Sequence, residues 1–273
     1  MARVVAPSGK EQQDLLAGNM QKMALNPPSS GKKKGKKGKS DEKKALKKQA
    51  QLERQLFNQQ VNACIWAARF KDQSGTEVRS LVEEFAPFAK FNRNGLDLEI
   101  KQYARGSGET SQVPKDIMNY CVNLTETNMQ QLYEDAGWGW NQLKKRRELE
   151  DEEARLLVAS DKTTGEPVGF MHFRFLREDD ATVLYVYELQ VDQEKAGRKG
   201  LGKHMMVLVE LAARKWGLDW CMLTVLDCNK KAQAFYGKLN YTIDETSPQM
   251  DVFEGESGET AYVILSKRMK KPE

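Results

Sequence analysis

A short glycine turn before a helix is the segment of this sequence with the clearest chemical meaning. The turn is Gly197-Arg198-Lys199-Gly200-Leu201-Gly202, and it separates a strand-like run over 184–191 from a helical pattern that begins near Lys203. Glycines allow a tight turn and a close backbone approach to a ligand, and the N–H groups at a helix start attract anions. Because Arg198, Lys199 and Lys203 add positive charge, the turn predicts a pyrophosphate site.

The spacing of this turn excludes the two common nucleotide-binding motifs. It is not Gly-x-Gly-x-x-Gly, and no acidic residue ends a second strand as a dinucleotide-binding fold requires. It also lacks the Gly-Lys-Ser/Thr ending of a P-loop. An isolated motif of this kind is commonly a purely structural turn. The elements around it must therefore show whether it is a turn of this kind or a pyrophosphate site.

Strand and helix patterns surround the turn in a definite order. The patterns before it predict a strand over 96–100, a helix over 115–136, and three strands over 155–160, 168–175 and 182–191. The turn-rich segment 161–165 suits a hairpin, so these three strands predict an antiparallel meander. The patterns after it predict a helix from 201 to 216 ended by Gly217, a strand over 220–226, a helix over 232–239 and a strand over 260–266. This order predicts a mixed α/β fold.

The amino-terminal part of the chain differs in composition from the rest. The chain has 273 residues and a formal net charge of +4, but ten lysines from Lys32 to Lys48 against Asp41 and Glu42 give that segment +8 and the remainder −4. We expect residues 1–39 to form a disordered basic tail. A nuclear localisation signal, a nucleic-acid tether and a merely solvated charge run are all compatible with it.

A long amphipathic helix is predicted after the tail, with Ser40 as its N-cap. Its apolar residues follow at helical spacing: Leu46, Ala50, Phe57, Val61, Cys64, Ile65 and Ala68. The stripe is too short for several heptads, so we expect it to pack on the domain and the chain to be a monomer. The predicted organisation is a tail over 1–39, a helical segment over 40–90 and an α/β domain over 91–273.

Composition also argues against two classes of protein. No stretch approaches the roughly 20 apolar residues that span a bilayer, and no early segment has the pattern of a signal peptide, so neither a membrane nor a secreted protein is expected. The four cysteines and two histidines are scattered without metal-ligand spacing. We therefore expect reduced intracellular thiols and no metal site.

With the meander before it, the glycine turn resembles the Arg/Gln-x-x-Gly-x-Gly/Ala loop of the GNAT superfamily of acetyltransferases. Gly197 stands where this family usually has Arg or Gln, and Arg198 lies one residue later. The resemblance implies the GNAT fold, a central mixed and mostly antiparallel sheet flanked by helices, with acetyl-CoA as cofactor. The residues that it assigns to the cofactor are Leu189, Gln190, Val191, Arg198, Lys199, Gly200, Leu201, Gly202, Lys203, Thr224 and Asn229. Asn229 fits an ordinary helix N-cap equally well.

Further segments resemble one branch of this superfamily, the NatD-type N-alpha-acetyltransferases that modify histone amino termini. They are Phe91–Leu96, Thr127–Gln130, Tyr133 with 138–140, His172–Phe175, 184–190, 198–203, 222–225 and 264–266. The resemblance implies acetyl transfer to the alpha-amine of histones H-four and H-two-A, whose tails begin Ser-Gly-Arg-Gly, in nucleus and cytoplasm. It leaves ribosome or nucleic acid as possible partners of Lys32–Lys48. Alternatives are a lysine or small-amine acetyltransferase, or a non-catalytic acetyl-CoA-binding adaptor of chromatin or the ribosome.

Two residues are candidates for proton transfer in such a reaction. An alpha-amine titrates near pH 8 and must lose a proton before it attacks a thioester. We predict Glu188 as the base, on a strand with a local bulge, against the alternative of an exposed strand glutamate. The resemblance assigns protonation of the departing thiolate to Tyr236, which could instead be an ordinary core ring.

The resemblance also implies a peptide channel. Its predicted aromatic walls are Tyr133, Trp138, Tyr185, Tyr187 and Tyr262, each of which could otherwise be a core residue. Leu176 occupies the acidic position directly after His172–Phe175. We therefore expect Glu178, Asp179 or Asp180 to receive the substrate arginine.

Overall fold

The computed structural model describes residues 47–49, 51–56, 58–59, 80–104, 113–178, 181–248 and 261–269. The described residues between 47 and 59 are helical and their side chains are exposed. The basic tail over 1–39 and the seven residues of the predicted apolar stripe lie outside the described residues. No helix within the described ranges has the length and apolar composition needed to cross a membrane.

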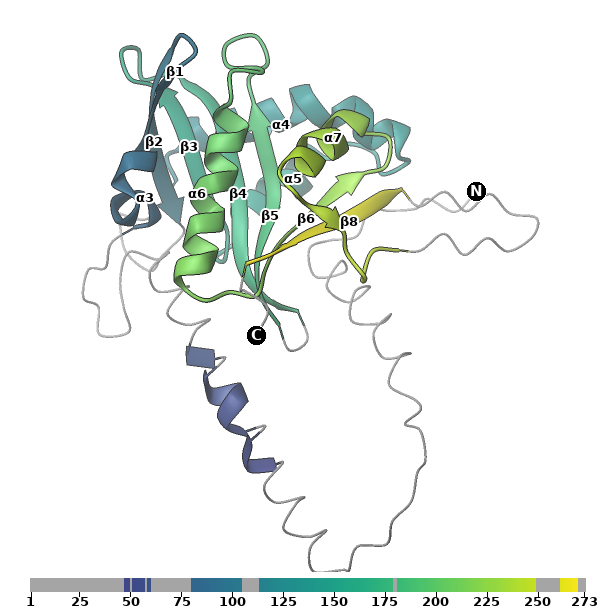
Figure 1. The fold of residues 1–273 in the computed structure, drawn as a ribbon. Helices are drawn as coiled ribbons and strands as arrows, with labels where there is room; N and C mark the ends of the chain where they lie inside the picture. Colours follow the sequence, from purple (N-terminus) through teal and green to yellow (C-terminus); the bar gives the residue numbers. More distant parts are fainter. Residues whose placement is uncertain are drawn as a thin grey trace, which may run out of the picture.

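One mixed sheet of eight strands, in the order β1-β2-β3-β4-β5-β6-β8-β7, forms the centre of the domain (Figure 1). The strands are β1 (Lys90–Arg93), β2 (Leu96–Ala104), β3 (Arg155–Asp161), β4 (Pro167–Glu178), β5 (Ala181–Val191), β6 (Trp220–Leu226), β7 (Thr242–Ile243) and β8 (Tyr262–Arg268). Every neighbouring pair is antiparallel except β5 and β6, which are parallel. The predicted meander and the predicted mixed sheet are confirmed.

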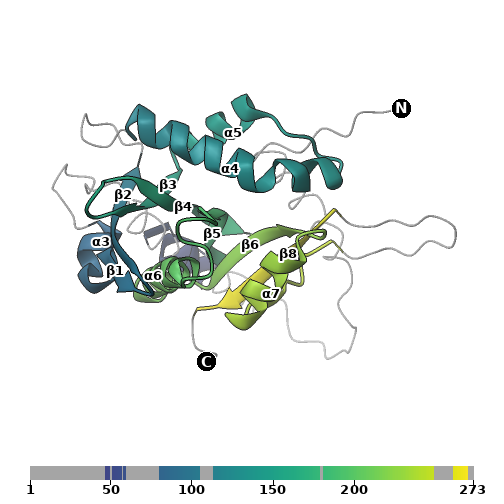
Figure 2. The ribbon, with the colours of Figure 1, turned by 90° about the horizontal axis from the view of Figure 1, so that it is seen from above.

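Helices cover both faces of the sheet, so the domain has three layers (Figure 2). They are α3 (Leu81–Glu84), the 3-10 helix η1 (Ala86–Ala89), α4 (Lys115–Asp135), α5 (Gln142–Leu149), α6 (Leu201–Lys215) and α7 (Lys230–Lys238). α4 and α5 lie on one face, and α3, α6 and α7 lie on the other. The apolar face of α6 supplies fully buried side chains such as Met205 and Leu208, and Gly217 ends this helix with a left-handed φ of 68° as predicted.

Of the elements that were not predicted individually, α5 and β1 have an identifiable local cause. α5 has no apolar stripe, since Leu149 is its one buried residue, and it begins because the Asn141 side chain accepts a hydrogen bond from the Lys144 N–H (2.9 Å). β1 forms a hairpin with β2 through Asn94 and Gly95, whose φ values of 55° and 74° suit a tight two-residue turn.

The middle of β5 is irregular, and this irregularity creates the site. His172 pairs with Glu188 while Phe173 pairs with Val186, so Tyr187 is an extra residue in β5. The bulge predicted beside Glu188 is therefore confirmed. β5 also pairs with β6 only as far as Val186 opposite Leu223, although both strands continue. Beyond that point the strands part, and no described strand pairs with the β6-facing edge of residues 187–191.

Candidate active site

A pocket of about 2090 Å³ opens where β5 and β6 separate. Its walls come from α4, the 137–141 loop, α5, β5, the glycine turn, α6, β6 and α7. Small-molecule sites typically measure roughly 300–1,000 Å³, so this pocket has room for a long ligand and for the end of a second one.

Most of the predicted site residues line this pocket. They are Tyr133, Trp138, Tyr185, Tyr187, Glu188, Leu189, Gln190, Val191, Arg198, Gly200, Leu201, Gly202, Lys203, Thr224, Asn229 and Tyr236. Glu178, Lys199 and Tyr262 are not in its wall, and Asp179 lies outside the described residues. Lys199 Nζ donates to the Lys195 carbonyl (2.9 Å), and Tyr262 packs edge-on against Trp138 at 5.7 Å between ring centroids.

The glycine turn presents backbone N–H groups to this pocket. Gly200, with a φ of 94°, is the N-cap of α6, and no side chain caps the helix. The first turn of α6 therefore keeps N–H groups that can bind an anion. Asn94 supports the turn from the tip of the β1–β2 hairpin, because its Nδ2 donates to the Lys199 carbonyl (2.7 Å). These features fit a pyrophosphate.

The backbone around Gly197 leaves no room for a side chain. A Cβ atom at Gly197 would lie 3.0 Å from the Gln193 Cα and carbonyl carbon, and closer still to the Gln193 carbonyl oxygen. All three are backbone atoms, so any side chain at this position requires the loop to move.

Asn229 and Thr224 lie on the opposite side of the gap. Asn229 Oδ1 accepts the Ala232 N–H at 3.1 Å, so Asn229 is the N-cap of α7, while its contact with a cofactor stays a prediction. The Thr224 hydroxyl is hydrogen-bonded to the Tyr185 hydroxyl. Tyr185 is thereby tied across from β5 to β6 just before the strands part.

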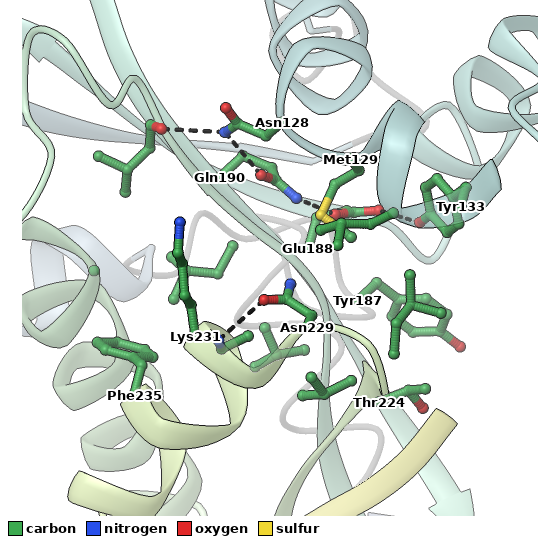
Figure 3. A pocket seen from close by; sticks show the side chains of 18 of the residues that line it. Asn128, Met129, Tyr133, Tyr187, Glu188, Gln190, Thr224, Asn229, Lys231 and Phe235 are labelled. Carbon is green, nitrogen blue, oxygen red and sulfur yellow. Dashed lines mark hydrogen bonds between the residues drawn. The ribbon is translucent and has the colours of Figure 1, made fainter. Parts of the chain in front are cut away.

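Glu188 is buried in the wall of the pocket, with 5% of the residue exposed, so the alternative of an exposed strand glutamate is wrong. Its Oε1 accepts hydrogen bonds from Lys145 Nζ (2.7 Å) and the Tyr133 hydroxyl (3.4 Å). Its Oε2 accepts one from Gln190 Nε2 (2.7 Å). Figure 3 shows Tyr133 and Gln190 on either side of the carboxylate.

Asn128 orients Gln190, the donor to Glu188 Oε2. Asn128 Nδ2 donates to Gln190 Oε1 (3.0 Å) and to the Val191 carbonyl (3.1 Å), as Figure 3 shows. The Gln190 side chain is thus engaged at both ends by protein groups. A cofactor contact by Gln190 would therefore use its backbone.

Stacked aromatic rings form one wall of the pocket. Tyr133 lies between Trp138 and Trp140, with 5.9 Å between its ring centroid and each of theirs. Tyr187 stacks on His172 at 4.9 Å, and burial raises the pKa of Tyr187 to about 12. These phenols stay protonated at neutral pH and can donate hydrogen bonds.

Leu176 cannot supply the acidic contact of the family pattern. It is buried in an apolar cluster with Val183, Tyr185, Met222 and Ile264. Burial raises the pKa of Tyr187, and the negative charges of Glu148 and Glu178 add to this rise. Glu148 lines the pocket, whereas Glu178, at the end of β4, is not in its wall.

Sequence reasoning missed three residues of this site: Asn128, Lys145 and Glu148. Lys145 and Glu148 fall in a charged segment without hydrophobic periodicity. Asn128 lies in the segment Thr127–Gln130 that carries the resemblance, but no role in the site was predicted for it. Their role depends on contacts between distant segments. Within the described residues, no group of three or more His, Cys, Asp or Glu side chains is placed to hold a metal ion.

One protein family and several solved structures are similar to this chain. Residues 124–241 match the model of the Acetyltransferase (GNAT) family. Solved structures similar to this chain include the PaiA N-acetyltransferase from Thermoplasma acidophilum in complex with coenzyme A (16% identity, 63% of this chain and 98% of that chain, TM-score 0.43). Others are the GNAT domain of S. lividans PAT (14%, 64% and 93%, 0.45) and the ribosomal-protein-S18-alanine N-acetyltransferase from Escherichia coli (14%, 64% and 96%, 0.42).

Proposed function

Since residues 124–241 match the GNAT family of acetyltransferases, we propose that this chain acetylates the amino-terminal alpha-amine of proteins that begin Ser-Gly-Arg-Gly. Histones H-four and H-two-A have such termini. The observation that carries the proposal is the Glu188 carboxylate, buried beside an aromatic wall at the point where β5 and β6 part.

Acetyl-CoA is the acetyl donor, and it supplies a thioester carbonyl that an amine can attack. The N–H groups of the Gly200–Gly202 turn would hold its pyrophosphate, with Arg198 and Lys203 adding positive charge at the same edge of the pocket. The unpaired edge of residues 187–191 offers backbone donors and acceptors to the rest of the cofactor, in the manner of an added strand.

Glu188 accepts a proton from the substrate ammonium, directly or through one water molecule, which leaves the amine able to attack. Tyr133, Trp138 and Tyr187 line the approach to the carboxylate and limit the water around it. The acetyl group passes directly to the amine, because no nucleophilic residue is required to carry it.

The Tyr236 hydroxyl is the proposed proton donor to the departing thiolate. Burial, and then the negative charge of Glu188, raise its pKa, so it keeps its proton at neutral pH. We expect Tyr236→Phe to lower kcat about 10-fold, because a thiol with a pKa near 8.5 leaves without much help.

A matched control for Tyr236 lies beside it. The ring of Tyr241 packs against Tyr236 at 5.8 Å between centroids but does not line the pocket. Tyr241→Phe should leave kcat within twofold of the wild type in steady-state assays. Equal losses in the two variants would mean that Tyr236 acts only through packing.

Recognition of the arginine at the third position of the substrate would distinguish the proposed enzyme from a less specific acetyltransferase. We propose that Glu178, Asp179 or Asp180 receives the substrate arginine. A Ser-Gly-Arg-Gly peptide should then be acetylated with a kcat/KM at least about 10-fold above that of Ser-Gly-Ala-Gly, the usual worth of a charge-assisted hydrogen bond. Equal kcat/KM values for the two peptides in initial-rate assays would show that the enzyme does not recognise the substrate arginine.

We propose that the protein works in nucleus and cytoplasm, with residues 1–39 as a tether to chromatin, ribosome or nucleic acid. The ten lysines of Lys32–Lys48 support this, because such a segment binds polyanions in a salt-dependent way. Deletion of residues 1–39 should leave peptide turnover unchanged and abolish binding to polyanions. Lost turnover would mean that the tail is needed for catalysis. Polyanion binding by the tail, without acetylation by the domain, would indicate an adaptor.

A further inference from the structure

Lys145 of α5 lies between two carboxylates in the wall of the pocket. Its Nζ atom donates to Glu188 Oε1 (2.7 Å) and to Glu148 Oε1 (2.9 Å), and it lies 5.6 Å from the centroid of the Tyr133 ring. The side chains of Lys145 and Glu188 are 11% and 3% exposed, so solvent screens this pair little. Glu148 is more open, with 21% of its side chain exposed.

Lys145 is an ammonium ion throughout the neutral range. Burial alone would lower its pKa, but the carboxylates of Glu148 and Glu188 outweigh burial and hold the pKa well above the usual lysine value. A buried carboxylate left without a cation would instead be driven to take up a proton.

The other groups around Glu188 do not supply the positive charge that Lys145 places beside it. Tyr133 of α4 and Tyr236 of α7 have raised pKa values, mainly through burial, and Gln190 is neutral. His172 of β4 has its pKa lowered well below the usual value by burial, then by Arg174 and Lys145, and it is uncharged. Among the residues that the structure describes, Lys145 is the cation that hydrogen-bonds Glu188.

We infer that Lys145 is a positioning residue for the proton transfer: it forms an ion pair with the Glu188 carboxylate, directs that carboxylate into the pocket and links it to the more exposed Glu148. The inference rests on the proposed function of Glu188 as base. The amine proton moves to Glu188 and is released to solvent before the next turnover, while Lys145 keeps its own protons and so stays the counter-ion of the carboxylate.

The test compares Lys145→Met, which keeps the length of the side chain without its charge, with Lys145→Arg. In Lys145→Met the acidic limb of the pH profile of kcat/KM should move upward by at least about one pH unit, the usual effect of losing an opposite charge at this distance. Lys145→Arg should restore the wild-type profile in large part. Arg147→Met removes an exposed cation from the same helix and should leave the profile in place.

A second measurement does not depend on turnover. The Glu188 carboxyl carbon, followed by 13C NMR in the enzyme without substrates, should change its signal at a higher pH in Lys145→Met than in the wild type. Unchanged NMR titration and an unchanged pH profile in Lys145→Met would overturn the inference. If instead the wild type acetylates no alpha-amine but Lys145→Met still shifts the NMR titration, the proposed function fails and the role of Lys145 stands.

Discussion

In the Glu188→Gln variant, kcat for the peptide alpha-amine should fall by roughly 100- to 10,000-fold, the range lost with a general base. Glutamine has the same shape and keeps an acceptor oxygen toward Lys145, but it cannot accept a proton from the substrate. The dissociation constant of acetyl-CoA, measured by calorimetry, should stay within twofold, because the glycine turn is untouched.

The pH dependence of kcat in the same variant is a second test of whether Glu188 is the general base. An alpha-amine titrates near pH 8, so above about pH 9 most of it is already deprotonated and needs no base. The deficit of Glu188→Gln should therefore shrink as the pH rises. Glu99→Gln, which changes an exposed glutamate of β2, serves as the control and should behave as the wild type. A Glu188→Gln enzyme with full activity at pH 7 would exclude Glu188 as the base.

The second large effect is expected from Gly197→Ala. The new Cβ atom would press on the backbone of Gln193, which cannot rotate away as a side chain could, so the turn has to shift. Hydrogen bonds to a charged group are each worth about 1.5–3 kcal/mol, so displacing one N–H group from the pyrophosphate should weaken acetyl-CoA binding roughly 10- to 100-fold. The KM for acetyl-CoA and its calorimetric dissociation constant should both rise.

Two other glycines provide controls for this change. A Cβ atom at Gly202 would meet Phe235 at 3.5 Å and Leu189 at 3.7 Å, which are ordinary contacts, and one at Gly237 within α7 would meet nothing within 4 Å. Gly202→Ala should leave the KM nearly unchanged, and Gly237→Ala should stabilise the protein by up to about 1 kcal/mol. A normal affinity for acetyl-CoA in Gly197→Ala would show that the turn tolerates the shift or does not bind the pyrophosphate.

The sequence was sufficient to predict those helices and strands in which apolar side chains recur at a regular spacing. The meander of β3, β4 and β5 alternates or forms continuous apolar runs, and α6 has a clear apolar face between a glycine turn and Gly217. α5 escaped prediction because its start depends on one side-chain cap and its residues are mostly charged. β1 escaped because a four-residue edge strand with one buried side chain has almost no pattern.

The candidate site divides in the same way. Glu188, the glycine turn and the aromatic residues have recognisable types and local spacing, and the bulge at Tyr187 lies between the buried residues Tyr185 and Glu188. Lys145 and Asn128 could not be found from the sequence, because their function exists only when α4 and α5 lie on the sheet next to β5. At Leu176 the resemblance led to the expectation of an acidic residue. The fold instead surrounds this position with apolar side chains, which the local sequence does not show.

The central claim is that the substrate is an alpha-amine deprotonated beside Glu188. The most direct test offers the enzyme acetyl-CoA and one peptide, Ser-Gly-Arg-Gly-Lys, which carries both an alpha-amine and a lysine, and locates the acetyl group by tandem mass spectrometry. The account predicts acetylation of the serine alpha-amine, with no product when that amine is blocked beforehand. Acetyl on the lysine side chain, or equal product from the blocked peptide, would contradict it.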